Sequence, residues 1–136
     1  MLSQPLSRAS AKPLLDERFA TFNGRFFEGR LRKVPVVFFN RFRDPVTQEE
    51  KLAGYMGDAE VGVIFLTDEA INMGADFAAD SLLHEMIHVA QRSRGDDGEK
   101  HGASFTSIAN RIADALGLEH VEPNSRGADC WPQTLR

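Results

Sequence analysis

The segment that most restricts the fold is LLHEMIHVAQ, residues 82–91, in which apolar residues surround a few polar ones. A helix with this sequence is apolar on nearly all of its faces and therefore has to be buried inside a domain. Buried imidazole and carboxylate groups need partners, because burying them without any is energetically costly. His84 and His88 are four residues apart, so they would stand one above the other on one helix face.

This spacing is typical of a metal site. Two histidines one turn apart can bind the same ion, while Glu85, about 100° around the helix, reaches past it. Zinc then holds a water molecule whose proton the carboxylate accepts. We therefore expect His84 and His88 to be zinc ligands and Glu85 to be the general base. Asp80 and Ser81 are expected to cap or acidify the first turn of the helix; alternatively, Asp80 orients the second ring nitrogen of His84.

A zinc site with two protein ligands is incomplete, and the sequence offers several residues as the third ligand. His101 is the preferred candidate, because it stands at the start of HGASF, where a glycine-rich loop enters the last expected helix. His120 lies in the C-terminal segment and is less favoured. If neither histidine binds the ion, a carboxylate does, and Glu99 or Glu119 is the next candidate.

Hydrophobic periodicity predicts the order helix, three strands, helix, loop, helix. The first helix has an apolar stripe that ends at a glycine, and the third strand is expected inside the sheet because its apolar run is nearly continuous. These features predict an α+β fold with an N-terminal helix, a sheet of about three strands, a metal-binding helix and a C-terminal helix. The expected helices are 14–29, 76–92 and 102–117, and the expected strands are 34–42, 51–58 and 61–68.

The chain of 136 residues has room for a single domain. We expect a flexible N-terminal tail at 1–13, the domain at 14–117 and a C-terminal tail at 118–136. No apolar run approaches the roughly 20 residues of a membrane-spanning helix, so we expect a cytoplasmic protein without membrane contact. One cysteine excludes an internal disulfide. We expect a monomer.

Charge is distributed unevenly along the chain. Residues 1–43 carry nine basic and three acidic side chains, whereas the other 93 residues carry seven basic and seventeen acidic ones. Such asymmetry indicates either a surface that faces nucleic acid or a solvated helix face with a basic loop. The candidate phosphate contacts are Arg25, Arg30, Arg32, Lys33, Arg41 and Arg43.

Three segments, in this order and spacing, resemble the SprT-like metalloproteases, whose eukaryotic member is called Spartan. FNGRFFEGRLRKVPVVF, at 22–38, looks like the opening segment of that family. SLLHEMIHVAQ, at 81–91, is close to its active-site helix. HGASF, at 101–105, is similar to its His-Gly-x-x-Phe element, which supplies the third zinc ligand. The resemblance extends from about Leu15 to Leu116.

The resemblance implies a compact zincin-like domain with zinc-dependent endopeptidase activity. It assigns His84, His88 and His101 as ligands of Zn²⁺ and Glu85 as the catalytic carboxylate. Family members act on proteins crosslinked to or bound on DNA, which implies weak single-stranded DNA binding by the basic residues and a nucleoid or nuclear location. Two alternatives remain open: a small dedicated processing protease that is independent of DNA, and a catalytically silent, zinc-stabilised binding module.

Overall fold

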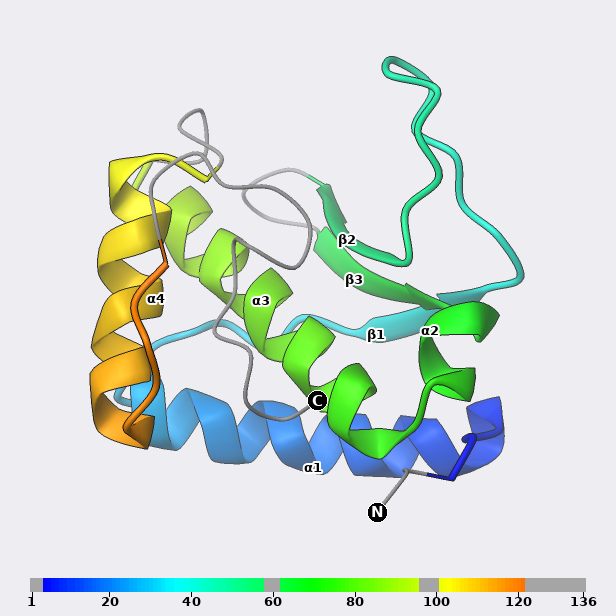
Figure 1. Ribbon diagram of the computed structural model, residues 1–136, viewed down its shortest axis with the longest axis horizontal. Helices are drawn as coiled ribbons and strands as arrows, with labels where there is room; N and C mark the ends of the chain where they lie inside the picture. The colour runs from blue at the N-terminus through cyan, green and yellow to red at the C-terminus, as the bar shows by residue number, and fades with distance from the viewer. Residues whose placement is uncertain (1–3, 58–61, 96–100, 122–136) are drawn as a thin grey trace. The chain divides into compact units, whose positions relative to one another are not determined.

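The computed structural model describes residues 4–57, 62–95 and 101–121. The chain divides into two compact units, residues 1–85 and 86–136. No helix in the described ranges is long and apolar enough to cross a membrane. The elements confirm the expected α+β class and follow in the order α1 (Arg8–Phe26), β1 (Val36–Phe39), β2 (Ala53–Gly57), β3 (Gly62–Thr67), α2 (Asp68–Asn72), α3 (Ala75–Ser93) and α4 (Ala103–Leu116) (Figure 1).

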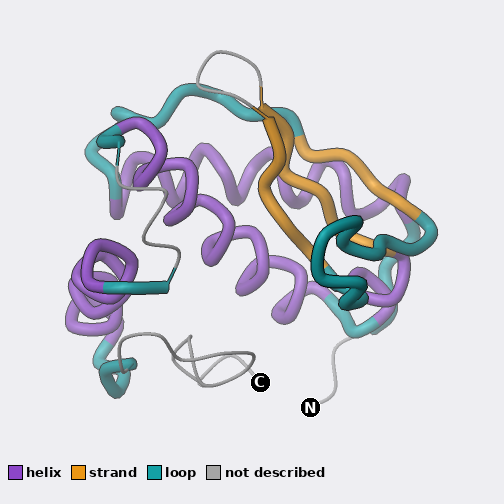
Figure 2. Tube along the Cα trace, turned by 90° about the horizontal axis from the view of Figure 1, so that it is seen from above, coloured by secondary structure: helices purple, strands orange, loops and turns teal. Residues whose placement is uncertain are grey.

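The three strands form one sheet in the order β1-β3-β2. β3 pairs parallel to β1, with Val36 opposite Ile64, and antiparallel to β2, with Tyr55 opposite Ile64. Figure 2 shows the strands side by side, with the loop that follows β1 folded back at one end of the sheet. The inner position predicted for the third strand is confirmed, and β2 and β1 are the edge strands.

Both faces of β3 are covered. Ile64, Phe65 and Leu66 are at most 1% exposed, although consecutive side chains of a strand point to opposite faces. On one face the ring of Phe65 lies 5.3 Å from that of Phe39 and 4.3 Å from that of Phe42. A Cβ at Gly54, the partner of Phe65 in β2, would lie 2.5 Å from the same ring. A side chain at position 54 would therefore force the buried Phe65 ring to move.

Helix α1 begins at Arg8, six residues before the expected start, and so includes residues 8–13 of the expected N-terminal tail. The Ser7 side chain accepts a hydrogen bond of 3.1 Å from the backbone N–H of Ser10 and caps the helix. Pro13 lies within the helix, and its ring is exposed. The stripe that faces the core consists of Ala11, Leu15, Phe19 and Phe26.

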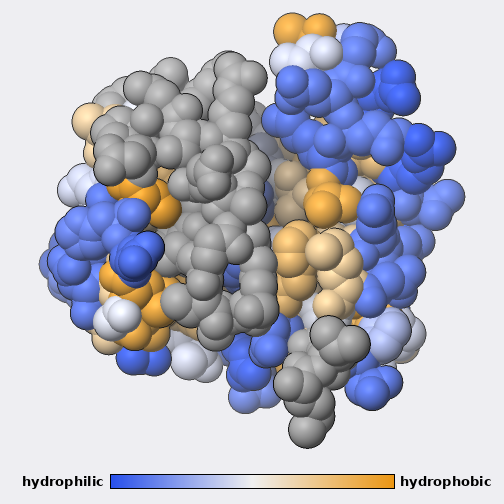
Figure 3. Space-filling model, in the orientation of Figure 1, coloured by the Kyte–Doolittle hydropathy of each residue, from blue (hydrophilic) through white to orange (hydrophobic). Residues whose placement is uncertain are grey.

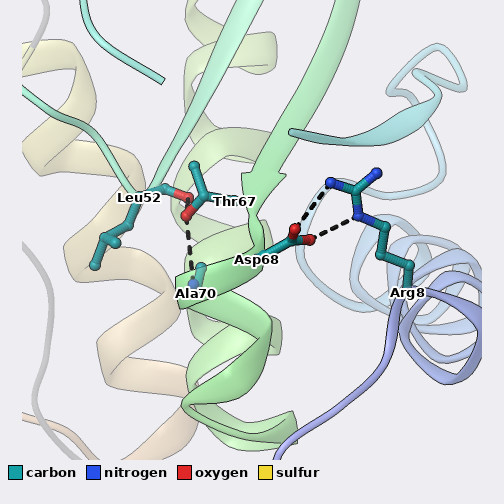
Figure 4. Close-up of polar contacts among 5 residues, drawn as sticks. All are labelled: Arg8, Leu52, Thr67, Asp68 and Ala70. Carbon is teal, nitrogen blue, oxygen red and sulfur yellow. Dashed lines mark hydrogen bonds and ion pairs between the residues drawn. The ribbon is translucent and has the colours of Figure 1, made fainter. Parts of the chain in front are cut away.

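A bidentate ion pair connects the first turn of α1 to α2. The Arg8 guanidinium donates to the two carboxylate oxygens of Asp68 at 2.6 and 2.9 Å, as Figure 4 shows. Thr67 precedes α2, where its hydroxyl donates to the carbonyl of Leu52 at 3.1 Å and accepts from the N–H of Ala70 at 3.3 Å. These contacts fix the short helix α2, which the sequence analysis did not predict.

The turn after α1 depends on an asparagine. The Asn23 side chain donates to the carbonyl of Leu31 and accepts from its N–H, both at 3.0 Å. Gly29 adopts a φ of 71°, and its N–H bonds to the carbonyl of Asn23. These bonds give a structural role to Asn23, Gly29 and Leu31, which all belong to the segment at 22–38.

The loop between β1 and β2 is held by polar contacts. The Asp44 carboxylate accepts from the N–H groups of Val46 and Thr47, and an isolated bridge pairs Arg43 with Glu50. Hydrogen bonding to these two N–H groups lowers the pKa of Asp44. In Figure 3 this loop, at the upper right, is mostly hydrophilic, although Val46 is 87% exposed.

Helix α3 runs from Ala75 to Ser93 and confirms the expected helix to within one residue at each end. Its first turn contains Asp76, whereas Asp80 lies in the second turn and is only 2% exposed. The prediction that Asp80 and Ser81 cap the helix is therefore wrong. The alternative role, in which Asp80 orients His84, stays a prediction.

Helix α4 confirms the expected last helix, and Gly117 ends it in the left-handed conformation with a φ of 72°. The Asn110 side chain then pairs with Val121, accepting from its N–H at 2.8 Å and donating to its carbonyl at 3.2 Å. This contact holds the chain against α4 as far as residue 121. Residues 122–136 of the expected C-terminal tail lie outside the described residues.

Candidate metal centre

Helix α3 presents His84 and His88 one turn apart, as the spacing predicts. Both imidazoles are half-buried, whereas the apolar residues between and around them are buried. The helix forms because its residues are mostly good helix formers, with no proline or glycine between Ala75 and Ser93. A regular helix fixes the separation of the two imidazoles, so their relation depends on local structure alone.

His101 joins these two histidines. One possible ligand atom from each of His84, His88 and His101 can be chosen so that all lie within 4.8 Å of one another. Tetrahedral zinc with Zn–N bonds of about 2.0–2.1 Å would need nitrogens roughly 3.4 Å apart, which small side-chain rotations can provide. The three histidines are therefore positioned to bind a metal ion.

His88, His101 and Phe105 form a compact ring cluster at the beginning of α4. The His88 and His101 ring centroids are 5.1 Å apart, and the Phe105 ring lies 4.9 and 4.8 Å from them. Phe105 is 1% exposed. The segment HGASF thus places a histidine beside α3 by burying the aromatic residue that follows it.

Glu85 is buried, with 7% of its surface exposed. Burial disfavours the charged carboxylate and raises the pKa of Glu85 to about 8 in the metal-free protein. The ammonium group of Lys51, two residues before β2, lies near enough to oppose this increase in the pKa. Lys51 is therefore a basic side chain within electrostatic range of Glu85.

Gln91 is a residue of this region that the sequence analysis did not select. It is 0% exposed, and its Oε1 lies 2.7 Å from Nδ1 of His88. Its Nε2 donates to the hydroxyl of Ser104 at 2.8 Å. The signal in the sequence is weak: a polar residue three positions after His88, in an otherwise apolar helix.

Two of the other candidates for the third ligand lie in the described part of the chain, and neither belongs to the histidine cluster. His120 is exposed, and its Nε2 lies 2.7 Å from the carboxylate of Asp114. Glu119 is exposed as well. Glu99 lies outside the described residues. Within the described part of the chain, the choice of His101 over His120 agrees with the geometry.

The six candidate phosphate contacts are divided between the two ends of β1. Arg25, Arg30, Arg32 and Lys33 precede the strand, whereas Arg41 and Arg43 follow it in the loop (Figure 1). All six are exposed. Arg41 and Arg43 both pair with the carboxylate of Glu50, which lowers the pKa of Glu50.

Comparison with known proteins gives one family. A sequence model described as the SprT-like family matches residues 15–126, which is most of the chain. No curated protein matches the chain significantly.

Proposed function

Since the chain belongs to the SprT-like family, we propose that it is a zinc-dependent endopeptidase with Glu85 as its general base. The family is generally of the metallopeptidase type, and three histidines positioned to bind a metal ion fit that activity. The observation that carries the proposal is the convergence of His101 with His84 and His88, next to a buried carboxylate on the same helix.

The chemistry of the donors favours zinc. Imidazole nitrogens are common zinc ligands, and three protein ligands leave a position open, as in catalytic rather than structural sites. Bound zinc would supply a Lewis acid that polarises a carbonyl and lowers the pKa of a water molecule to about 7. His84, His88 and His101 are the residues that would hold it.

Glu85 is the residue that moves protons in this proposal. Its carboxylate accepts a proton from the attacking water and then returns it to the nitrogen of the leaving amine. In the metal-free protein, burial keeps the pKa of Glu85 near 8. With a dication bound by the three histidines, the ionised form of Glu85 would be favoured and its pKa would be lower, so that Glu85 could act as a base at neutral pH.

The edge strand β2 is the element that would bind the substrate. An extended peptide can add to a sheet edge through backbone hydrogen bonds, with little demand on its side chains. The β2 sequence is AGYMG, so three of its five residues have no side chain or a single methyl group. Lys51, two residues before β2, interacts electrostatically with Glu85. We therefore propose that the protein cleaves extended segments with weak sequence preference.

Replacing Glu85 by glutamine tests the catalytic role. The amide keeps the shape of the side chain but removes the base, so Glu85→Gln should abolish cleavage of an unfolded protein such as casein and retain about one zinc per chain. The matched control is Glu17→Gln, at an exposed position of α1, which should leave cleavage unchanged. Zinc is measured by mass spectrometry beside the cleavage assay. Cleavage by Glu85→Gln near the wild-type rate would overturn the role of Glu85 as general base, whereas a wild-type protein that binds zinc and cleaves nothing would leave the zinc-stabilised binding module.

We also propose, as the preferred substrate class, proteins associated with or crosslinked to DNA, which the protein would reach as a monomer at the nucleoid or in the nucleus. The exposed basic residues around β1 support this substrate class. The rival is a dedicated processing protease that shares the chemistry and has no dependence on DNA. Cleavage of casein with and without single-stranded DNA separates the two, because DNA should accelerate cleavage only in the first case.

A further inference from the structure

A partly buried chain of hydrogen bonds connects His88 to α4 through Gln91. Oε1 of Gln91 lies 2.7 Å from Nδ1 of His88, and Nε2 donates to the hydroxyl of Ser104 at 2.8 Å. Gln91 is 0% exposed. A buried amide has few possible hydrogen-bond partners. The orientation of the Gln91 amide therefore depends on whether each neighbouring group donates or accepts a hydrogen bond.

The contact with Ser104 is compatible with both orientations of the Gln91 amide, because a hydroxyl both donates and accepts hydrogen bonds. The contact with His88 distinguishes the two orientations. A neutral imidazole binds a metal through the nitrogen that carries no proton, and Nδ1 is already occupied by Gln91. If Oε1 of Gln91 accepts the bond, Nδ1 of His88 carries the proton and Nε2 keeps the lone pair for the metal.

Gln91 also acts on the segment that carries His101. Ser104 follows His101 by three residues, and Phe105, the next residue, lies beside the rings of both His88 and His101. The bond from Gln91 to Ser104 therefore joins the same part of α4 to the turn of α3 that carries His88. One side chain fixes the tautomer of one ligand and restrains the segment that supplies another.

We propose that Gln91 is a positioning residue for the metal centre: it holds His88 as the Nδ1–H tautomer, so that Nε2 binds the ion, and it anchors the start of α4 through Ser104. This inference rests on the proposed metal site. It concerns the orientation of the ligands and assigns no proton transfer to Gln91.

The tautomer can be measured without metal. In the metal-free protein, at a pH where the imidazole is neutral, ¹⁵N NMR of His88 should show a protonated Nδ1 and an unprotonated Nε2. Free histidine prefers the opposite tautomer, so Gln91→Leu should shift His88 toward Nε2–H. A wild-type His88 that carries its proton on Nε2 overturns the inference without any variant.

Zinc affinity, measured by competition with a chelator, is the second readout. Loss of such an outer partner weakens metal binding by about 10–100-fold, which is the effect expected for Gln91→Leu. Gln91→Glu should rescue affinity to within about threefold of wild type, because a carboxylate accepts the same bond from Nδ1. Wild-type affinity in a folded Gln91→Leu protein contradicts the inference, and so does an equal loss in both variants.

Serine variants keep the test decisive if Gln91→Leu does not fold. Ser104→Ala removes the outer bond and should weaken zinc binding several-fold, whereas the matched control Ser107→Ala, at an exposed position of α4, should not change it. Equal affinities of the two serine variants overturn the anchoring role. If the wild-type protein binds no zinc, the proposed function fails, and the NMR measurement alone still decides the role of Gln91.

Discussion

His101 and His120 are both in the C-terminal part of the chain, and their surroundings differ in a way that matters for metal binding. His101 is half-buried and lies beside the rings of His88 and Phe105. His120 is exposed, and its nitrogen lies 2.7 Å from the carboxylate of Asp114. Such a pair contributes little to stability on a solvated surface. An imidazole held by a buried aromatic neighbour keeps its orientation without the ion, so less order has to be gained when the ion binds.

These surroundings predict different effects of removing each histidine. His101→Ala should weaken zinc binding by about 100-fold or more, because losing a ligand costs at least as much as losing an outer partner. His120→Ala should leave zinc affinity within about twofold of wild type. Competition against a zinc chelator measures both variants. If His120→Ala weakens zinc binding and His101→Ala does not, the wrong histidine has been assigned.

The sequence was sufficient for His84, Glu85 and His88, because a regular helix determines their relation from spacing alone. His101 required one further step, namely that a histidine at the entry of a helix can lie beside another helix. Gln91 was not predictable in the same way. Its role depends on Ser104, thirteen residues away on another helix, and no periodic pattern relates the two positions.

The helical segments that the sequence did not predict are those that depend on contacts distant in the chain. The first turns of α1 contain a proline, and α2 has only five residues. Neither has a strong local preference for helix, and both are joined by the ion pair between Arg8 and Asp68, sixty residues apart. The long helices α3 and α4, whose apolar patterns are strong, were predicted to within one residue at each end.

The ion pair predicts a dependence of stability on pH. The bond from Arg8 lowers the pKa of Asp68, so the stability it adds is present above the unfolded pKa of about 3.9. That stability is lost as the pH falls through the lower, folded pKa. Asp68→Asn should therefore lower the melting temperature at pH 7, and the difference from wild type should shrink as the pH falls to 2–3. The control is Glu69→Gln, which removes a charge from the same helical turn without a contact to Arg8.

A loss of melting temperature in Asp68→Asn that is the same at pH 7 and at pH 2–3 would show that the asparagine disturbs packing, and would contradict the assigned role of the ion pair. An equal loss in Glu69→Gln at pH 7 would show that the effect comes from charge at the start of α2. Thermal unfolding followed by circular dichroism is sufficient for all three proteins.

The charge asymmetry of the sequence corresponds to two separate groups of basic side chains in the structure. The basic residues are close in sequence but do not form one surface, because β1 lies between the two groups. In the group after β1, Arg41 and Arg43 both pair with Glu50. In the other group Arg30 pairs with Glu28 at 3.1 Å, whereas Arg32 and Lys33 are exposed. The group before β1 is therefore the better candidate for contact with phosphates.

Single-stranded DNA binding should consequently depend on the group before β1. With about three phosphate contacts, the logarithm of affinity should fall with the logarithm of salt at a slope of roughly −2, at about −0.7 per contact. Replacing Arg30, Arg32 and Lys33 by serine should flatten this slope and leave casein cleavage in the absence of DNA unaffected. The matched double variant Arg41→Ser, Arg43→Ser should change the slope less. Fluorescence anisotropy of a labelled oligonucleotide across a salt series measures all three proteins.

Absence of wild-type binding at about 20 mM salt, where screening is weakest, would remove DNA-linked proteins as the substrate class. The dedicated processing protease would then take their place. An equal flattening of the slope in the double variant would mean that both ends of β1 contact the DNA.

The position of β2 at the edge of a small sheet has a consequence for how targets would be chosen. A segment that adds to this edge has to give up its own secondary structure first, and folded proteins open locally with free energies that range from near zero to their full stability. When opening is fast relative to cleavage, the rate of degradation follows the population of the open form. The half-life of a target would then report the local stability of that target, and two proteins with the same sequence at the cleaved bond would survive for very different times.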